Sequence, residues 1–161
     1  DVDLEGGSIT TNSSVIRTQD LGITIQPPKT AASRRKIDID PDTVEILRQD
    51  KIRQMEHRLI IGAAYEDNDL VFPDAFGKPL NPMALTRAYK SLARWAGVPE
   101  GGLHSLRHFH ASALFDQGES PMLVSRRLGH ASIKTTVDIY GHLFEGAQKQ
   151  AAETFGKAMR G

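Results

Sequence analysis

Residues 103–141 read LHSLRHFHASALFDQGESPMLVSRRLGHASIKTTVDIYG, and this stretch divides into three helix-length segments. The first covers about 104–117 and ends before a glycine. A Ser-Pro pair at 120–121 is typical of a helix start, and that helix ends where Gly129 interrupts it. A third helix is predicted over 132–140, again followed by a glycine. The stretch therefore predicts a helical region with well-marked boundaries.

The first forty residues have a different pattern, which is typical of strands. Short polar–apolar alternations rich in β-branched residues, interrupted by Gly and Pro, predict strands over 8–11, 14–18, 22–26 and 35–39. The turn before the last strand falls at 27–33. We therefore expect a small antiparallel β-sheet over residues 1–40.

Two more helices are predicted between this sheet and the C-terminal stretch. Asp40 and Pro41 are typical of a helix start and precede a long helix over about 41–61. A brief extended piece is expected at 70–72, and a helix is expected from Asn81-Pro82 to Gly97. The predicted fold class is thus α+β. A small N-terminal antiparallel β-sheet is followed by a mainly α-helical bundle, with a helical core over 41–142 and an amphipathic C-terminal helix over 143–161.

The composition fits a globular domain with balanced charge. The chain has 161 residues, 39% of them hydrophobic, which is enough apolar material for a core. Twenty basic and twenty acidic residues give a formal net charge of zero, so the basicity of tail-type nucleic-acid binders is absent. The lack of cysteine excludes disulfides, thiol catalysis and thiolate metal sites. No apolar run approaches the roughly 18 residues that cross a bilayer, and no membrane partner is expected.

A cluster of basic and imidazole side chains begins the stretch quoted above. On a helix, His104, Arg107 and His108 share one face because they stand at positions i, i+3 and i+4. One permanent cation beside two imidazoles suits a phosphate, since a guanidinium binds two oxygens and an imidazole transfers protons near neutral pH. An ordinary polar face is the alternative. A zinc helix is another, although the Glu of a metalloprotease motif is missing.

A second cluster follows where the next two helices meet. His130 stands directly after the break at Gly129, and Tyr140 ends the following helix. Taken singly, a tyrosine in such a place is typical of a half-buried core residue.

Together, the segments His104-Ser105-Leu106-Arg107-His108 and Leu128-Gly129-His130, followed by Tyr140, resemble the C-terminal signature of the tyrosine recombinases, the phage integrase family. The similarity is strong over 98–145 and weaker over 1–97. It implies an N-terminally truncated catalytic domain over 1–161, from a phage or mobile-element integrase that breaks and rejoins DNA at specific sites without a metal or other cofactor. A non-catalytic DNA-binding relative with the same fold is the alternative.

The resemblance also assigns roles to single residues. Tyr140 is implied as the nucleophile that forms a 3′-phosphotyrosyl link, and Arg107 as the group that stabilises the transition state. His104 is implied to assist proton movement at the tyrosine, and His130 to hydrogen-bond a phosphate oxygen. Lys29, in the turn between two strands, is the candidate general acid for the leaving 5′-oxygen.

Further expectations concern segments that the family resemblance implies but that are not in these 161 residues. The chain begins with Asp1 rather than Met, and the resemblance implies a first catalytic arginine in a helix upstream of it. We therefore expect the 161 residues alone to be inactive or nearly so. The implied partners are double-stranded DNA attachment sites, a homotetramer on DNA in the intact protein, and accessory DNA-bending or directionality proteins, all in the bacterial cytoplasm. The C-terminal helix is implied to exchange between protomers or to fold back in cis.

Two groups of basic residues are candidates for contact with the DNA backbone. Arg34, Arg35 and Lys36 lie close together without an acid between them, and Arg87, Lys90 and Arg94 share a helical face. Such groups neutralise phosphates without reading sequence. Solvated surface is the alternative. Acidic residues gather elsewhere, so a basic face is expected despite the zero net charge.

Overall fold

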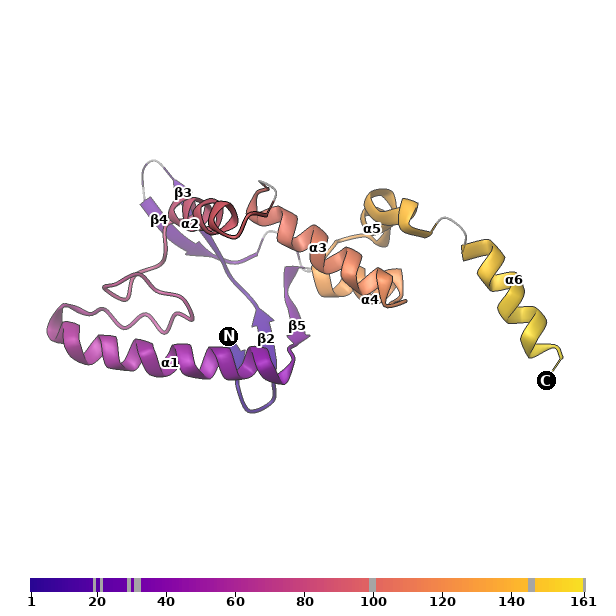
Figure 1. The fold of residues 1–161 in the computed structure, drawn as a ribbon. Helices are drawn as coiled ribbons and strands as arrows, with labels where there is room; N and C mark the ends of the chain where they lie inside the picture. The colour runs from indigo at the N-terminus through magenta and orange to yellow at the C-terminus, as the bar shows by residue number, and fades with distance from the viewer. Residues whose placement is uncertain are drawn as a thin grey trace. The chain divides into compact units, whose positions relative to one another are not determined.

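The computed structural model describes residues 1–161 except 19, 21, 29, 31–32, 99–100, 145–146 and 161, and it leaves the side chains of 144, 147, 148 and 150 undescribed. The chain divides into two compact units, Asp1–Ser105 and Leu106–Gly161. Among the described residues, antiparallel strands come first and six α-helices follow (Figure 1). The predicted α+β class is therefore confirmed.

The strands of the first unit form two sheets among the described residues. β1 (Val2–Asp3), β2 (Ser8–Thr11) and β5 (Arg35–Asp38) make an antiparallel sheet in the order β1-β2-β5. β3 (Ser14–Thr18) and β4 (Gly22–Gln26) make a separate antiparallel pair.

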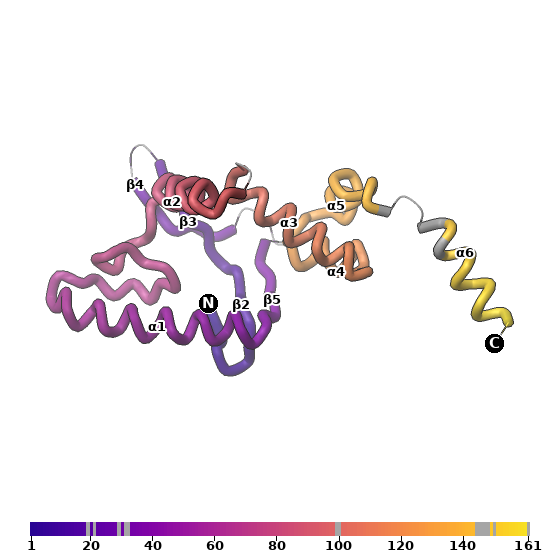
Figure 2. The backbone as a smooth tube through the Cα atoms, viewed as in Figure 1, coloured from indigo at the N-terminus to yellow at the C-terminus, as the bar shows by residue number. Residues whose placement is uncertain are grey.

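The prediction of a single sheet is therefore wrong in detail. The chain runs from β2 directly on toward β3 (Figure 2), but the polar residues 12–13 between them belong to neither strand. On one side of this break β2 pairs with β5, and on the other side β3 pairs with β4.

The two long helices of the first unit begin where their caps predict. α1 (Pro41–Ile61) starts after Asp40, whose carboxylate accepts hydrogen bonds from the backbone N–H and the hydroxyl of Thr43. α2 (Pro82–Trp95) starts after Asn81, whose side chain accepts a bond from the N–H of Met83. A short 3₁₀ helix, η2 (Gly62–Ala64), follows α1.

The brief extended piece expected within a loop at 70–72 lies in a loop and forms no regular strand. These residues are irregular, and an isolated bridge joins Pro73 to Pro79 after them. The carboxylate of Asp74 accepts hydrogen bonds from the N–H groups of Phe76 and Lys78, so it closes a compact turn instead.

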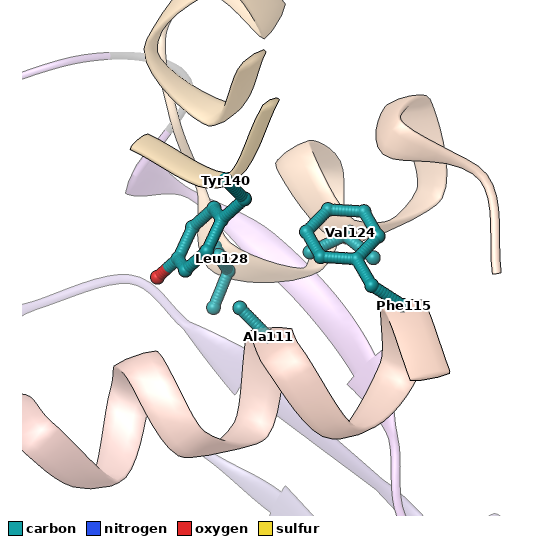
Figure 3. Close-up of a cluster of buried hydrophobic side chains, with 5 residues drawn as sticks. All are labelled: Ala111, Phe115, Val124, Leu128 and Tyr140. Atoms are coloured by element: carbon teal, nitrogen blue, oxygen red, sulfur yellow. The ribbon is translucent and has the colours of Figure 1, made fainter. Parts of the chain in front are cut away.

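The second unit contains most of α3 (Leu103–Asp116), then α4 (Pro121–Leu128), α5 (Ile133–Tyr140), the short 3₁₀ helix η3 (Gly141–Phe144) and α6 (Ala147–Ala158). Its core consists of five buried residues from α3, α4 and α5 (Figure 3): Ala111, Phe115, Val124, Leu128 and Tyr140. Within the described part of the chain, no helix is long and apolar enough to cross a membrane.

Candidate active site

Tyr140 is the last residue of α5, and its ring belongs to the core of the second unit. Only 4% of the residue is exposed, and the ring centroid lies 5.5 Å from that of Phe115. The hydroxyl lies at the edge of the cluster and points away from Phe115 and Val124 (Figure 3). It is 2.8 Å from Nδ1 of His108. The ring is therefore fixed by packing, while the oxygen has a polar partner.

The surroundings of Tyr140 keep its hydroxyl protonated at neutral pH. Burial raises the pKa of Tyr140 above its usual value, because the phenolate loses more hydration than the phenol does. The positive charge of Arg107 lowers the pKa by a smaller amount. A reaction that uses the tyrosine oxygen as a nucleophile therefore needs a group that removes the proton.

Arg107 is anchored to the end of α4. Its guanidinium donates a hydrogen bond from Nη2 to the carbonyl oxygen of Leu128, the last residue of that helix. The last carbonyls of a helix have no partner within the helix, and a cation there also interacts favourably with the helix dipole. This contact holds the half-buried side chain of Arg107 beside the break that precedes His130.

His130 is positioned by the backbone turn that ends α4. Gly129 has a φ of 72°, in the left-handed region that favours glycine. The N–H of His130 donates to the carbonyl of Ser125 at 3.0 Å, and the N–H of Gly129 donates to that of Arg126 at the same distance. This is the Schellman pattern of helix termination. The turn leads the chain away from α4 at His130.

The imidazole of His130 is held from the other side by α5. Its Nδ1 lies 2.7 Å from the hydroxyl oxygen of Thr136, which is fully buried. Thr136 stands one helical turn before Tyr140, so both side chains face the interior. The contact fixes the orientation of the imidazole ring and therefore also the direction in which Nε2 points.

The second unit therefore brings three of the predicted site residues, Arg107, His130 and Tyr140, to the ends of α4 and α5. His104 lies in the first turn of α3, one turn before His108, and it is exposed. It belongs to the first unit. In the same turn the hydroxyl of Ser105 bonds to the carbonyl of Gly102 and lies 3.1 Å from the hydroxyl of Tyr89. Lys29 lies outside the described residues.

The six basic residues predicted to contact DNA all lie in the first unit. Five of them are exposed: Arg34, Lys36, Arg87, Lys90 and Arg94. Arg35 differs, because it is half-buried and donates a hydrogen bond to the carbonyl of Ser33. Its position in β5 opposite Thr11 explains this, since side chains alternate between the two faces of a strand.

Sequence reasoning missed two residues of the site. The sequence places His108 with His104 and Arg107 on a face suited to a phosphate but gives it no role at Tyr140, although it contacts the hydroxyl of that tyrosine. The spacing of His108, Ala111 and Phe115 would have shown that His108 shares a helix face with two core residues. Thr136 would have been found by its position four residues before Tyr140.

No group of three or more His, Asp or Glu side chains that could hold a metal ion occurs among the described residues. Of the two histidines with zinc-helix spacing, His108 is the one in contact with Tyr140.

Known proteins with similar sequences include recombinases, integrases and a transposase. The sequence matches the phage integrase family over residues 5–146. A protein named tyrosine recombinase XerC-like, from Caldanaerobacter subterraneus subsp. tengcongensis, is 33% identical over 132 residues, which are 80% of this chain and 34% of that protein. The ICEBs1 integrase of Bacillus subtilis is 31% identical over 129 residues, which are 80% of this chain and 35% of that protein.

Solved structures share the fold. The Tn1549 transposon integrase in complex with transposon right end DNA has a TM-score of 0.78 and 19% identity, over 95% of this chain and 50% of that one. The XerA recombinase has a TM-score of 0.63 and 24% identity, over 96% of this chain and 48% of that one. The chain thus spans about a third of these curated relatives and about half of these solved chains.

The family match covers most of the sequence and includes the second unit up to residue 146, with Arg107, His130 and Tyr140. The chain therefore belongs to the phage integrase family.

Proposed function

We propose that the intact protein catalyses site-specific recombination of DNA, as in the integration and excision of phage or other mobile-element DNA. The observation that supports this most strongly is the setting of Tyr140. Its hydroxyl contacts an imidazole, and it lies close enough to the guanidinium of Arg107 for that charge to lower its pKa. A phenol among such groups is suited to attack a phosphodiester.

The proposed reaction proceeds through a covalent protein–DNA intermediate. The oxygen of Tyr140 attacks the scissile phosphorus, a 3′-phosphotyrosyl bond forms, and the 5′-oxygen leaves as a hydroxyl. The energy of the broken bond is kept in the new one, so rejoining needs no nucleotide cofactor. Attack by a 5′-hydroxyl of the other DNA end reverses the chemistry and completes recombination.

The other site residues are proposed to act on the phosphate and the leaving group. Arg107 binds the non-bridging oxygens and stabilises the charge of the transition state. His130 donates a hydrogen bond to a phosphate oxygen through Nε2. The contact of its Nδ1 with Thr136 holds the ring in one orientation for this bond. His104 assists proton movement, and Lys29 protonates the 5′-oxygen.

DNA and further protein copies are the proposed partners. The exposed basic side chains of α2, together with Arg34 before β5 and Lys36 within it, would neutralise backbone phosphates. The Tn1549 integrase, which shares the fold, was solved with DNA.

Phe155 and Met159 in the last turns of the chain are 67% and 71% exposed, which supports exchange of α6 between protomers in a tetramer. Light scattering before and after removal of residues 147–161 tests the exchange, because loss of α6 should reduce the mass of the assembly. Accessory DNA-bending or directionality proteins are further proposed partners. The protein is proposed to act on DNA in the bacterial cytoplasm.

The experiment is a trapping assay with the intact protein. The probes are nicked duplexes tiled across the DNA that flanks the reading frame, because the short strand freed by cleavage diffuses away and the covalent adduct accumulates. We expect an adduct that survives denaturation with the wild type and none with Tyr140→Phe. An intact protein that binds these duplexes without forming an adduct would instead be a non-catalytic DNA-binding relative. The 161 residues alone, assayed in parallel, test the expectation that they have little activity.

A further inference from the structure

Resting on the proposed function, we propose that His108 is a further catalytic residue, which accepts the phenol proton of Tyr140 as the tyrosine oxygen attacks the phosphate. The sequence resemblance gives no role to His108 and implies His104 as the group that assists proton movement at the tyrosine. The contact with the hydroxyl assigns the acceptance of the phenol proton to His108 in place of His104. The proposal depends on a direct contact with the reacting oxygen.

The contact is a consequence of how α3 packs. Ala111 and Phe115 of α3 are buried against Tyr140 in the core of the second unit. His108 precedes them by three and seven residues, so the same helix face carries all three side chains. Packing this face on the tyrosine ring places the imidazole at the ring's outer end. The result is a distance of 2.8 Å between Nδ1 and the hydroxyl, with 5.7 Å between the two ring centroids.

The tyrosine is available as the donor of this hydrogen bond, because burial raises the pKa of Tyr140 and the hydroxyl carries its proton at neutral pH. In the tautomer of His108 that carries its proton on Nε2, Nδ1 accepts the bond. This is the arrangement of a base in contact with the nucleophile that it activates.

Every proton and electron pair that moves in this step has a donor and an acceptor. The bond from the Tyr140 oxygen to phosphorus forms as the bond from phosphorus to the 5′-oxygen breaks, and the electron pair leaves on the 5′-oxygen. The tyrosine proton moves to Nδ1 of His108 and makes an imidazolium. The 5′-oxygen takes a proton from a general acid, for which Lys29 is proposed. In the rejoining step the imidazolium returns its proton to Tyr140, and the attacking 5′-hydroxyl gives its proton back to the amine of Lys29.

A purely structural role is the competing explanation, because buried hydroxyls usually have a hydrogen-bond partner. The two roles separate in His108→Asn. An asparagine can accept a hydrogen bond from the phenol through its amide oxygen, but it cannot take the proton. Asparagine should therefore preserve the fold and the position of Tyr140 while it removes the base. Thermal melts of this variant and of His108→Ala check that both fold.

The test uses the intact protein and the duplex on which the wild type forms its adduct, made with either oxygen or sulfur at the bridging 5′ position. A thiolate leaves without being protonated, so the sulfur substrate removes the need for a general acid but not for a base. We expect His108→Ala and His108→Asn to form adduct about 100-fold more slowly than the wild type on both substrates. Lys29→Ala should be slow with oxygen and recover with sulfur.

His110→Ala is the matched control, since His110 lies on the same helix but bonds to Arg127 rather than to Tyr140. Its rate should stay close to that of the wild type. A wild-type rate for His108→Asn would overturn the proposal and reduce His108 to a positioning residue. Recovery of the His108 variants on the sulfur substrate would also overturn it, because the imidazole would then serve the leaving group. If the wild type forms no adduct, the proposed function itself fails, and the two failures are thereby distinguished.

Discussion

The ring and the hydroxyl of Tyr140 have separate surroundings, and substitutions can separate their contributions. Tyr140→Phe keeps the ring in the core and removes only the hydrogen bond to His108, which should cost about 1 kcal/mol of unfolding free energy. Tyr140→Ala also empties the space beside Phe115 and should cost about 3–5 kcal/mol. Urea denaturation of each variant measures its loss of unfolding free energy. Equal losses for the two variants would show that the ring contributes little to packing.

Thr136 should affect the rate of the reaction through His130. Thr136→Val keeps the volume of this buried residue but removes the hydroxyl that holds Nδ1 of His130. A hydrogen bond of about 0.5–1.5 kcal/mol corresponds to a loss of about twofold to 13-fold in adduct formation by the intact protein. Thr135→Val, at an exposed neighbouring position, is the control and should react like the wild type. Identical rates for both variants would contradict the role of Thr136.

For single residues, the sequence predicted most members of the site but not the contacts between their side chains. The family resemblance carried by the motifs around Arg107, His130 and Tyr140 predicts that these residues act together. Which imidazole touches the tyrosine was not predictable in the same way, because it depends on the packing of α3 against α5, between residues 32 positions apart. Thr136 shows the same limit, since a fully buried hydroxyl is recognised only once its partner is known.

The turn that ends α4 connects an element boundary to the site. Gly129→Ala places a side chain on a left-handed residue, which should cost about 1–2 kcal/mol of stability and displace His130. Gly118, which follows α3 with a φ of 84° and open space around its Cβ position, provides a matched control. We expect Gly118→Ala to lose similar stability by urea denaturation but to keep its rate of adduct formation once folded. Gly129→Ala should lose at least about tenfold in rate, and equal rates would show that the turn does not position His130.

Helix boundaries were the most predictable feature because local chemistry sets them. Asp40, Asn81 and Ser120 cap their helices with their own side chains, each followed directly by a proline. The pairing of strands was less predictable, because β2 and β3 have similar patterns and only the break at 12–13 separates their partners. Val44, Leu47, Ile52, Met55 and Leu59 are spaced approximately as one helical face of α1, but they are not all buried. Val44 is buried, whereas Leu59 near the other end of the helix is 83% exposed.

The zero net charge of the whole chain conceals local differences that should appear in DNA binding. Arg87, Lys90 and Arg94 are exposed on α2, and replacing all three by Ala should weaken binding of every duplex to a similar degree. The dependence of log affinity on log salt should become shallower by about 3. Fluorescence anisotropy over a salt series measures this. The control replaces Arg48, Lys51 and Arg53 of α1, which are also exposed. An equal change in slope for both triple variants would show that α2 is not a preferred DNA contact.

The most direct measurement for the whole molecule is the identity of the residue that becomes linked to DNA. The chain has three tyrosines, Tyr65, Tyr89 and Tyr140. The covalent adduct of the intact protein can be digested with protease and nuclease, and mass spectrometry then locates the remaining nucleotide on a peptide. We predict that it lies on Tyr140, through a 3′-phosphate. A nucleotide on any other tyrosine, Tyr65 and Tyr89 included, or an intact protein that cleaves DNA without any phosphotyrosyl peptide, would contradict the assignment of Tyr140 as the nucleophile.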